Sequence, residues 1–268
     1  MLQFQKLGNA EWNFKLNREF DMTNDSHLFN TVNQEGYLPL FEGKMIHQFI
    51  HQFAQPRYWV NEKNGKAVLT KNDSENQIAD YEKFRIGIRA IARNTDERTM
   101  ISGPVPPNVF CGNSILVSKV SYSNNDLFYL QSILNSFALD FYARQMVSAN
   151  INMFYIYQLP VPRLTPQDRW YNAIVSRAAR LICTTEAFSE LWEDVMGNRW
   201  SEAKAATQED ERNQLRAELD GVIAHIYGLT EEEFAYVLST FPIVPQAQKE
   251  AALNAYSDVE RGRINYIF

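Results

Sequence analysis

The chain has 268 residues, of which 45% are hydrophobic, 13% aromatic and 22% charged. This is the composition of an ordinary globular protein that is long enough to bury a core, and it excludes disordered and collagen-like chains. The net charge of −6 and the pI near 5.4 argue against a nucleic-acid-binding protein, because such proteins usually carry a basic excess.

The charge is distributed unevenly along the chain. Residues 1–162 carry 15 basic and 15 acidic side chains, whereas residues 163–268 carry 11 and 17. Within the first part, residues 43–98 carry ten basic and seven acidic side chains. We therefore expect that a polyanion could be bound only by one face of the N-terminal half.

The sequence shows no sign of secretion or membrane insertion. No apolar run approaches the roughly 18 residues that cross a bilayer, and residues 1–14 lack the basic and apolar regions of a signal peptide. We expect a cytoplasmic protein with no membrane contact. Cys111 and Cys183 are too few for a disulfide framework, so both are predicted to be reduced and buried.

Short strands are predicted in the first half. Apolar residues alternate over 84–91, which predicts a half-buried strand with Arg85 and Arg89 on one face. Residues 67–70, which follow an Asn-Gly turn, and residues 115–120 are further strand candidates.

Helical spacing begins after these strands. Apolar residues at steps of three and four predict one helix over 126–147, capped by Asn125. A Thr-Pro pair at 165–166 predicts the start of a helix of about 30 residues.

The last quarter has clear helix boundaries. Apolar positions from 215 to 226 predict a helix that Gly228 ends, and residues 230–233 form a capping box that begins the next helix. Together these patterns predict an α+β fold, with a mixed β-rich domain over 1–162 and a helical region over 163–268.

Motifs of the common enzyme classes are not found. A base methyltransferase that uses S-adenosylmethionine needs a Gly-rich loop and an Asn/Asp-Pro-Pro-aromatic motif for the extruded base, and the 268 residues contain neither. Phosphate-binding loops and the Gly-x-Ser-x-Gly elbow do not occur either. No catalytic residue is therefore assigned.

Two metal sites can be considered. His47 and His51 have the i,i+4 spacing of zinc ligands on a helix, but a polar surface pair is favoured, and no metal ligand is assigned. Asp21, Glu42 and Lys44 could serve a Mg²⁺-dependent nuclease, and this alternative stays open.

Basic and polar side chains gather within residues 44–98. Arginine forks and an asparagine amide are the groups that bind guanine and adenine edges or phosphates, while a solvated strand face with a salt-bridged turn explains the same residues equally well. Basic residues among aromatic ones at 44–58 add a weaker signal. The candidate DNA-binding residues are Lys44, His47, Gln48, Arg57, Arg85, Arg89, Arg93, Asn94 and Arg98.

Three longer strings resemble a known family. They are REFDMTNDS (18–26), PLFEGKMIHQF (39–49) and IARNTDERT (91–99). They are similar to the C-terminal part of adenine-specific DNA methyltransferases of type II restriction–modification systems, in the group with TaqI- and Eco57I-like specificity domains. Shorter matches follow at 134–136, 158–162, 219–220 and 227–229.

This resemblance implies a target-recognition domain that binds double-stranded DNA and supplies sequence specificity. A separate N-terminal methyltransferase domain of the same polypeptide would bind S-adenosylmethionine and transfer the methyl group, so no cofactor is expected within these 268 residues. The string at 93–98 is common to enzymes with different targets, and the resemblance therefore implies that it binds phosphates or supports the fold. A protein-docking module of the same enzyme remains a further alternative.

Overall fold

The computed structural model describes residues 3–71 and 80–264. The strands are β1 (Leu16–Asn17), β2 (Phe29–Asn30), β3 (Tyr37–Phe41), β4 (Tyr58–Asn61), β5 (Arg85–Arg89), β6 (Ser102–Val105), β7 (Phe110–Cys111) and β8 (Ile115–Ser118). The helices are α1 (Glu62–Lys71), α2 (Asn124–Asn135), α3 (Phe137–Arg144), α4 (Met153–Tyr157), α5 (Tyr171–Ile182), α6 (Ser189–Met196), α7 (Glu209–Ile226), α8 (Glu231–Ser239) and α9 (Gln246–Glu260). This is the predicted α+β fold.

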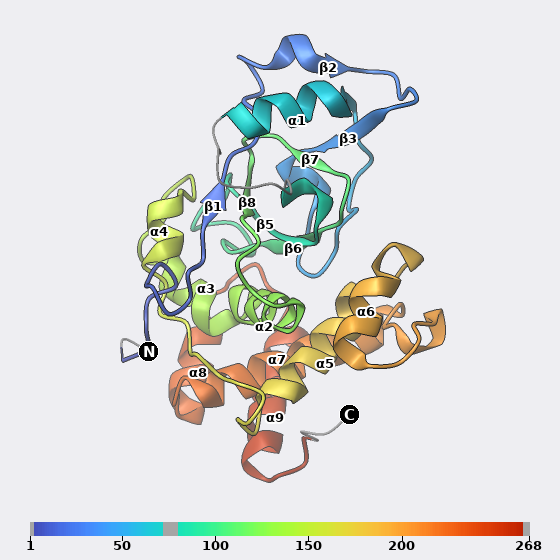
Figure 1. The fold of residues 1–268 in the computed structure, drawn as a ribbon. Helices are drawn as coiled ribbons and strands as arrows, with labels where there is room; N and C mark the ends of the chain where they lie inside the picture. Colours follow the sequence, from blue (N-terminus) through green and yellow to red (C-terminus); the bar gives the residue numbers. More distant parts are fainter. Residues whose placement is uncertain (1–2, 72–79, 265–268) are drawn as a thin grey trace.

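The strands form two four-stranded sheets, in the orders β1-β8-β5-β6 and β2-β4-β3-β7. All pairs are antiparallel except β3 with β7. Figure 1 shows the sheets and α1 in the upper part of the molecule, α2 and α3 across the middle with α6 at the right, and α5, α7, α8 and α9 below. The predicted strands at 84–91 and 115–120 are confirmed as β5 and β8.

The strand predicted at 67–70 is wrong, because these residues belong to helix α1. The Asn-Gly pair does not form a hairpin turn. Gly65 lies inside the helix against the ring of Phe110, where a Cβ would come within 2.6 Å of the ring atoms. Val68 and Leu69 pack against the core of the second sheet, so the apolar run belongs to the buried side of a helix.

The helix predicted over 126–147 is two helices. Ser136 has an extended backbone, with ψ of 150°, and its hydroxyl accepts a hydrogen bond from the N–H of Leu139. It therefore ends α2 and caps α3. The N-terminal cap of α2 is Ser123, which accepts from the N–H of Asp126, and not the predicted Asn125.

The prediction of one long helix from residue 165 is wrong, because α5 ends at Ile182 and a second helix, α6, begins at Ser189. The carboxylate of Asp168 accepts hydrogen bonds from the N–H and the hydroxyl of Thr165, which closes a turn, and α5 begins only at Tyr171. The later boundaries are confirmed. Gly228 adopts a left-handed φ of 69° after α7, and Thr230 and Glu233 form the capping box of α8.

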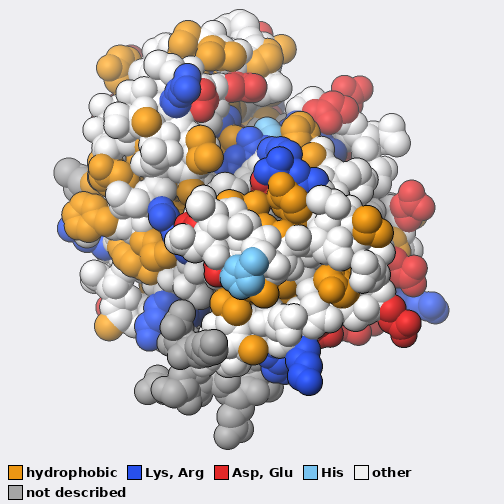
Figure 2. All heavy atoms as spheres, turned by 90° about the horizontal axis from the view of Figure 1, so that it is seen from above, with side chains coloured by type: hydrophobic (Ala, Val, Ile, Leu, Met, Phe, Trp, Pro, Cys, Tyr) orange, Lys and Arg blue, Asp and Glu red, His pale blue; other side chains and the backbone are white. Residues whose placement is uncertain are grey.

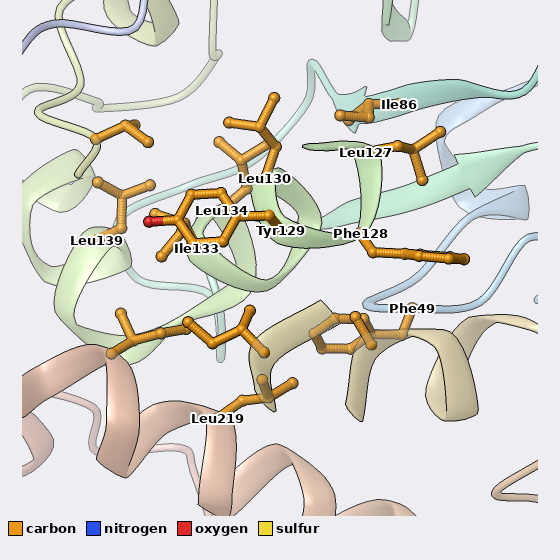
Figure 3. Close-up of a cluster of buried hydrophobic side chains, with 14 of the residues drawn as sticks. Phe49, Ile86, Leu127, Phe128, Tyr129, Leu130, Ile133, Leu134, Leu139 and Leu219 are labelled. Atoms are coloured by element: carbon orange, nitrogen blue, oxygen red, sulfur yellow. The ribbon is translucent and has the colours of Figure 1, made fainter. Parts of the chain in front are cut away.

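Helix α2 lies at the centre of the main core. Its side chains pack between Ile86 of β5 and Leu219 of α7 (Figure 3). This core includes residues from both sides of position 162, while the division into domains at that position stays a prediction. Cys111 and Cys183 are free and buried, as predicted. Among the described residues, no helix is both long and apolar enough to span a bilayer.

Candidate nucleic-acid interface

Two adjoining hollows lie beside the end of β5, and five of the predicted DNA-binding residues line them. The larger hollow, of about 400 Å³, reaches α7 and α9, and the smaller has about 330 Å³. Arg89 and Ile91 line both hollows. In the view from above, Lys and Arg side chains gather beside a histidine in a recess of the surface (Figure 2).

Arg89 is the most favourably placed of the predicted residues. It is the last residue of β5 and is half-buried. Its Nε donates a hydrogen bond of 2.8 Å to the carbonyl of Ile46, which fixes the direction of the guanidinium group. Burial lowers the pKa of Arg89, and among the described residues no carboxylate forms an ion pair with it. A half-buried arginine that lacks an anionic partner is prepared to bind an external anion.

A tight turn at residues 47–50 forms one wall of the larger hollow. His47 and Ile50 exchange two backbone hydrogen bonds of 2.9 Å. The turn rests on Gly103 of β6, where a Cβ would come within 2.7 Å of the Ile50 carbonyl and 2.8 Å of the His47 carbonyl. Only glycine permits this approach of the turn to the sheet.

The two histidines do not form the predicted surface pair. The ring of His47 lies 4.8 Å from the ring of Phe53, and that of His51 lies 4.7 Å from Phe188. Both histidines are half-buried, and burial lowers the pKa of each to about 4. His47 is therefore neutral near pH 7, so it can contribute hydrogen bonds to the hollow but no positive charge.

The side chains of Arg98 and Gln48 form hydrogen bonds inside the protein and offer little surface to a ligand. Arg98 is 8% exposed, and its Nε lies 2.7 Å from a carboxylate oxygen of Asp140. Its Nη2 donates to the carbonyl of Asn135, and its guanidinium lies 4.1 Å from the ring centre of Phe137. Gln48 is 6% exposed and donates to the same Asn135 carbonyl. Both side chains are mostly engaged within the protein, and their assignment as DNA contacts stays a prediction.

Among the predicted DNA-binding residues, Arg85 has the surroundings that fit a DNA contact least. Its side chain is fully buried, and its guanidinium forms an ion pair with Glu19 and donates to the carbonyl of Val109. Glu19 also accepts a hydrogen bond of 2.8 Å from the N–H of Cys111. The prediction of a half-buried strand is wrong, because residues 85–88 are buried on both faces of β5 and only Arg89 is partly exposed.

The remaining predicted residues lie at the surface. Arg57 donates two hydrogen bonds, of 2.7 and 2.8 Å, to the carboxylate of Glu42, and Lys44 lies 3.9 Å from the same group. One of these two positive charges is therefore neutralised. Arg93 and Asn94 are exposed in the turn that follows β5, and the N–H of Arg93 donates to Asp96.

Asp21 and Glu42, the carboxylates considered for a Mg²⁺-dependent nuclease, already accept hydrogen bonds within the protein. Both oxygens of Glu42 accept from Arg57. One oxygen of Asp21 accepts from the N–H groups of Thr23 and Asn24, and these bonds lower its pKa. Within residues 3–71 and 80–264, no three His, Cys, Asp or Glu side chains are grouped so as to hold a metal ion.

Most residues that line the larger hollow were not among the predicted site residues. Ile91, Arg216 and Asp220 are three of them. Asp220 accepts a hydrogen bond of 2.8 Å from the N–H of Phe137, and burial raises its pKa to about 6. The available signal for Asp220 was the short family match at 219–220, because the apolar stripe of the predicted helix does not include this residue.

The raised pKa of Asp220 predicts a pH-dependent stability. Its ordinary value is 3.8 and its folded value is about 6, so the folded protein retains a proton that the unfolded chain releases between these pH values. Stability is therefore lost as the pH rises through this window. Asp220→Asn, which keeps the acceptor for Phe137, is expected to raise the free energy of unfolding at pH 7 by up to about 3 kcal/mol.

Urea unfolding of both proteins as a function of pH measures this effect. The difference between Asp220→Asn and the unsubstituted protein should shrink as the pH falls toward 4. A constant difference across the range would show that proton binding at Asp220 is not its cause.

The chain is similar to several solved structures. No family model and no curated protein matches the chain. Among solved structures, it is similar to the type IIL restriction–modification enzyme MmeI in complex with DNA, with 13% identity and a TM-score of 0.48, over 92% of this chain and 35% of that one. It is also similar to the type IIG restriction endonuclease BpuSI, with 14% identity and a TM-score of 0.44, over 82% of this chain and 31% of that one.

The chain thus spans about a third of the length of each of these restriction–modification enzymes.

Proposed function

We propose that this chain is a DNA target-recognition module of an adenine-N6 methyltransferase from a restriction–modification system, and that it has no catalytic activity of its own. The observation that carries the proposal is Arg89, a half-buried guanidinium without a carboxylate partner among the described residues. It lies between two hollows, and Lys44 lines one of them. The strings at 18–26, 39–49 and 91–99 support the same function through their resemblance to specificity domains.

Affinity for duplex DNA would come mainly from a few phosphate contacts. Arg89, Arg93 and Lys44 are the accessible cations of this surface, and the charge of Lys44 is partly balanced by Glu42. Neutralising one phosphate contributes about −0.9 to the slope of log affinity against log salt. The isolated chain should therefore bind weakly, and a separate methyltransferase domain on the same polypeptide would raise the effective concentration of DNA at this surface.

S-adenosylmethionine would be bound by that other domain. Gly87 and Gly103 of this chain lie opposite each other in the β5–β6 ladder, and not in a loop that leads from a strand into a helix, where a nucleotide cofactor is usually held. The proposal therefore assigns DNA binding to this chain and methyl transfer to the separate domain.

A titration against a random-sequence duplex pool at about 50 and 200 mM salt tests the proposal, because phosphate contacts weaken over this range. We expect binding that falls with salt and that enriches one short motif on selection. Absence of binding at both salt concentrations, with the methyltransferase domain also supplied, would overturn the proposal and favour a protein-docking module.

Arg89→Ala is expected to weaken duplex binding about 10-fold, because it removes a charge-assisted hydrogen bond to a phosphate. The salt slope should become shallower by about 0.9. The matched control is Arg263→Ala, an arginine with a 66% exposed side chain that borders neither hollow. An equal loss in both variants would show a general charge effect, and no loss in Arg89→Ala would remove Arg89 from the interface.

A further inference from the structure

An exposed isoleucine forms the ridge between the two hollows. Ile91 is 68% exposed and lines both hollows. Its neighbours Ala90 and Ala92 are 6% and 3% exposed, so the strand-like alternation continues past β5 and directs this apolar side chain outward. Nothing in the core requires an isoleucine at this position.

The backbone that presents Ile91 is held on both sides. The N–H of Arg89 donates to Ile101 at 3.0 Å, and the N–H of Ala90 donates to Ser114 at 2.9 Å. The carbonyl of Ala90 accepts a bond of 2.8 Å from the N–H of Ile151. The ridge is therefore rigid, so placing its apolar tip in a partner requires little ordering of the protein.

Positive charge lies before and after Ile91 along the chain, while Asp96 and Glu97 line the larger hollow at the following turn. Arg89 and Arg93 lie two residues before and after Ile91, and among the described residues neither guanidinium is paired with a carboxylate. Lys44 lines the smaller hollow beside the ridge. An apolar tip between cations is complementary to a double-stranded nucleic acid, in which phosphates run on both sides of stacked, apolar base faces.

We infer that Ile91 is a wedge that inserts between adjacent base pairs of duplex DNA, unstacks one step and bends the helix, while Arg89 and Arg93 bind the phosphates on either side. This inference rests on the proposed function and adds a mechanism to it. The hollows on both sides of the ridge leave room for the displaced sugars and base edges. Inserted apolar side chains are one way in which proteins kink DNA.

The test uses the whole 268-residue chain and a short duplex with a central TA step, because pyrimidine–purine steps are the most easily unstacked. Permanganate oxidation of the thymines reports unstacking, and energy transfer between dyes on the two ends reports bending. The unsubstituted protein at saturation should increase thymine oxidation and shorten the end-to-end distance. Ile91→Ala should lower both signals to those of the free duplex while keeping the salt slope of binding.

The matched control is Ile243→Ala, which removes another isoleucine that is 58% exposed but lines neither hollow. It should leave both signals unchanged. Salt-dependent binding without unstacking, or unstacking that Ile91→Ala retains, would overturn the wedge and leave the proposed function standing. Failure of the unsubstituted protein to bind any duplex, with the methyltransferase domain also supplied, would overturn both. If Ile91→Ala weakens only binding to the methyltransferase domain, Ile91 is a protein contact and the wedge is wrong.

Discussion

Arg85→Ala is expected to lower the free energy of unfolding by about 3–5 kcal/mol, the usual cost of removing one partner of a buried ion pair. Arg85 is fully buried, and its partner Glu19 is only 4% exposed at the side chain. Burial already raises the pKa of Glu19 against the opposing effect of Arg85. Without the guanidinium, the carboxylate would remain buried with no counterion. Urea unfolding at neutral pH measures the loss.

The double variant Glu19→Leu with Arg85→Met distinguishes this cause from a packing defect. Replacing both charges by apolar groups of similar size should recover part of the stability, because neither charge is then left unpaired. The recovery is incomplete because the N–H of Cys111 and the carbonyl of Val109 lose these hydrogen-bond partners. If Arg85→Ala is as stable as the unsubstituted protein and binds DNA less tightly, Arg85 belongs to the DNA surface and its assignment to the core is wrong.

Asp140→Ala is the second substitution with a large expected effect, also about 3–5 kcal/mol. Asp140 is fully buried and accepts hydrogen bonds from the N–H groups of Thr99 and Met100 at 3.1–3.2 Å, as well as from Arg98. Arg144 lies 3.7 Å away. Removing the carboxylate leaves Arg98 and Arg144 without this counterion. It also removes the hydrogen bonds that hold the backbone of Thr99 and Met100.

Hydrogen exchange separates this effect from general destabilisation. The N–H groups of Thr99 and Met100 should lose protection more than those of β8 in Asp140→Ala. Asp140→Asn keeps one acceptor oxygen for these groups and should retain more of the protection. Equal loss of protection throughout both sheets would show that Asp140 supports the whole fold and does not specifically hold this segment.

Local signals in the sequence predicted several elements correctly. The alternation at 84–91 gave β5, Gly228 ended α7, and the capping box at 230–233 began α8. The two helix-boundary signals act through hydrogen bonds or backbone preferences within a few residues. The failures at 67–70 and at Ser136 have one cause, because an apolar run or a continuous apolar stripe fits more than one structure until its packing partner is known.

The candidate site was predictable in its residue types but not in its exposure. Sequence alone determined that the chain is α+β and that its basic residues concentrate within 43–98. The tertiary structure decided that Arg85 is buried and that Arg89 is accessible, although both lie on one face of the same strand. The physical reason is that the counterion of Arg85 comes from Glu19, 66 positions away. Pairing over such a separation depends on how the sheets and helices pack, and no periodicity in the sequence records it.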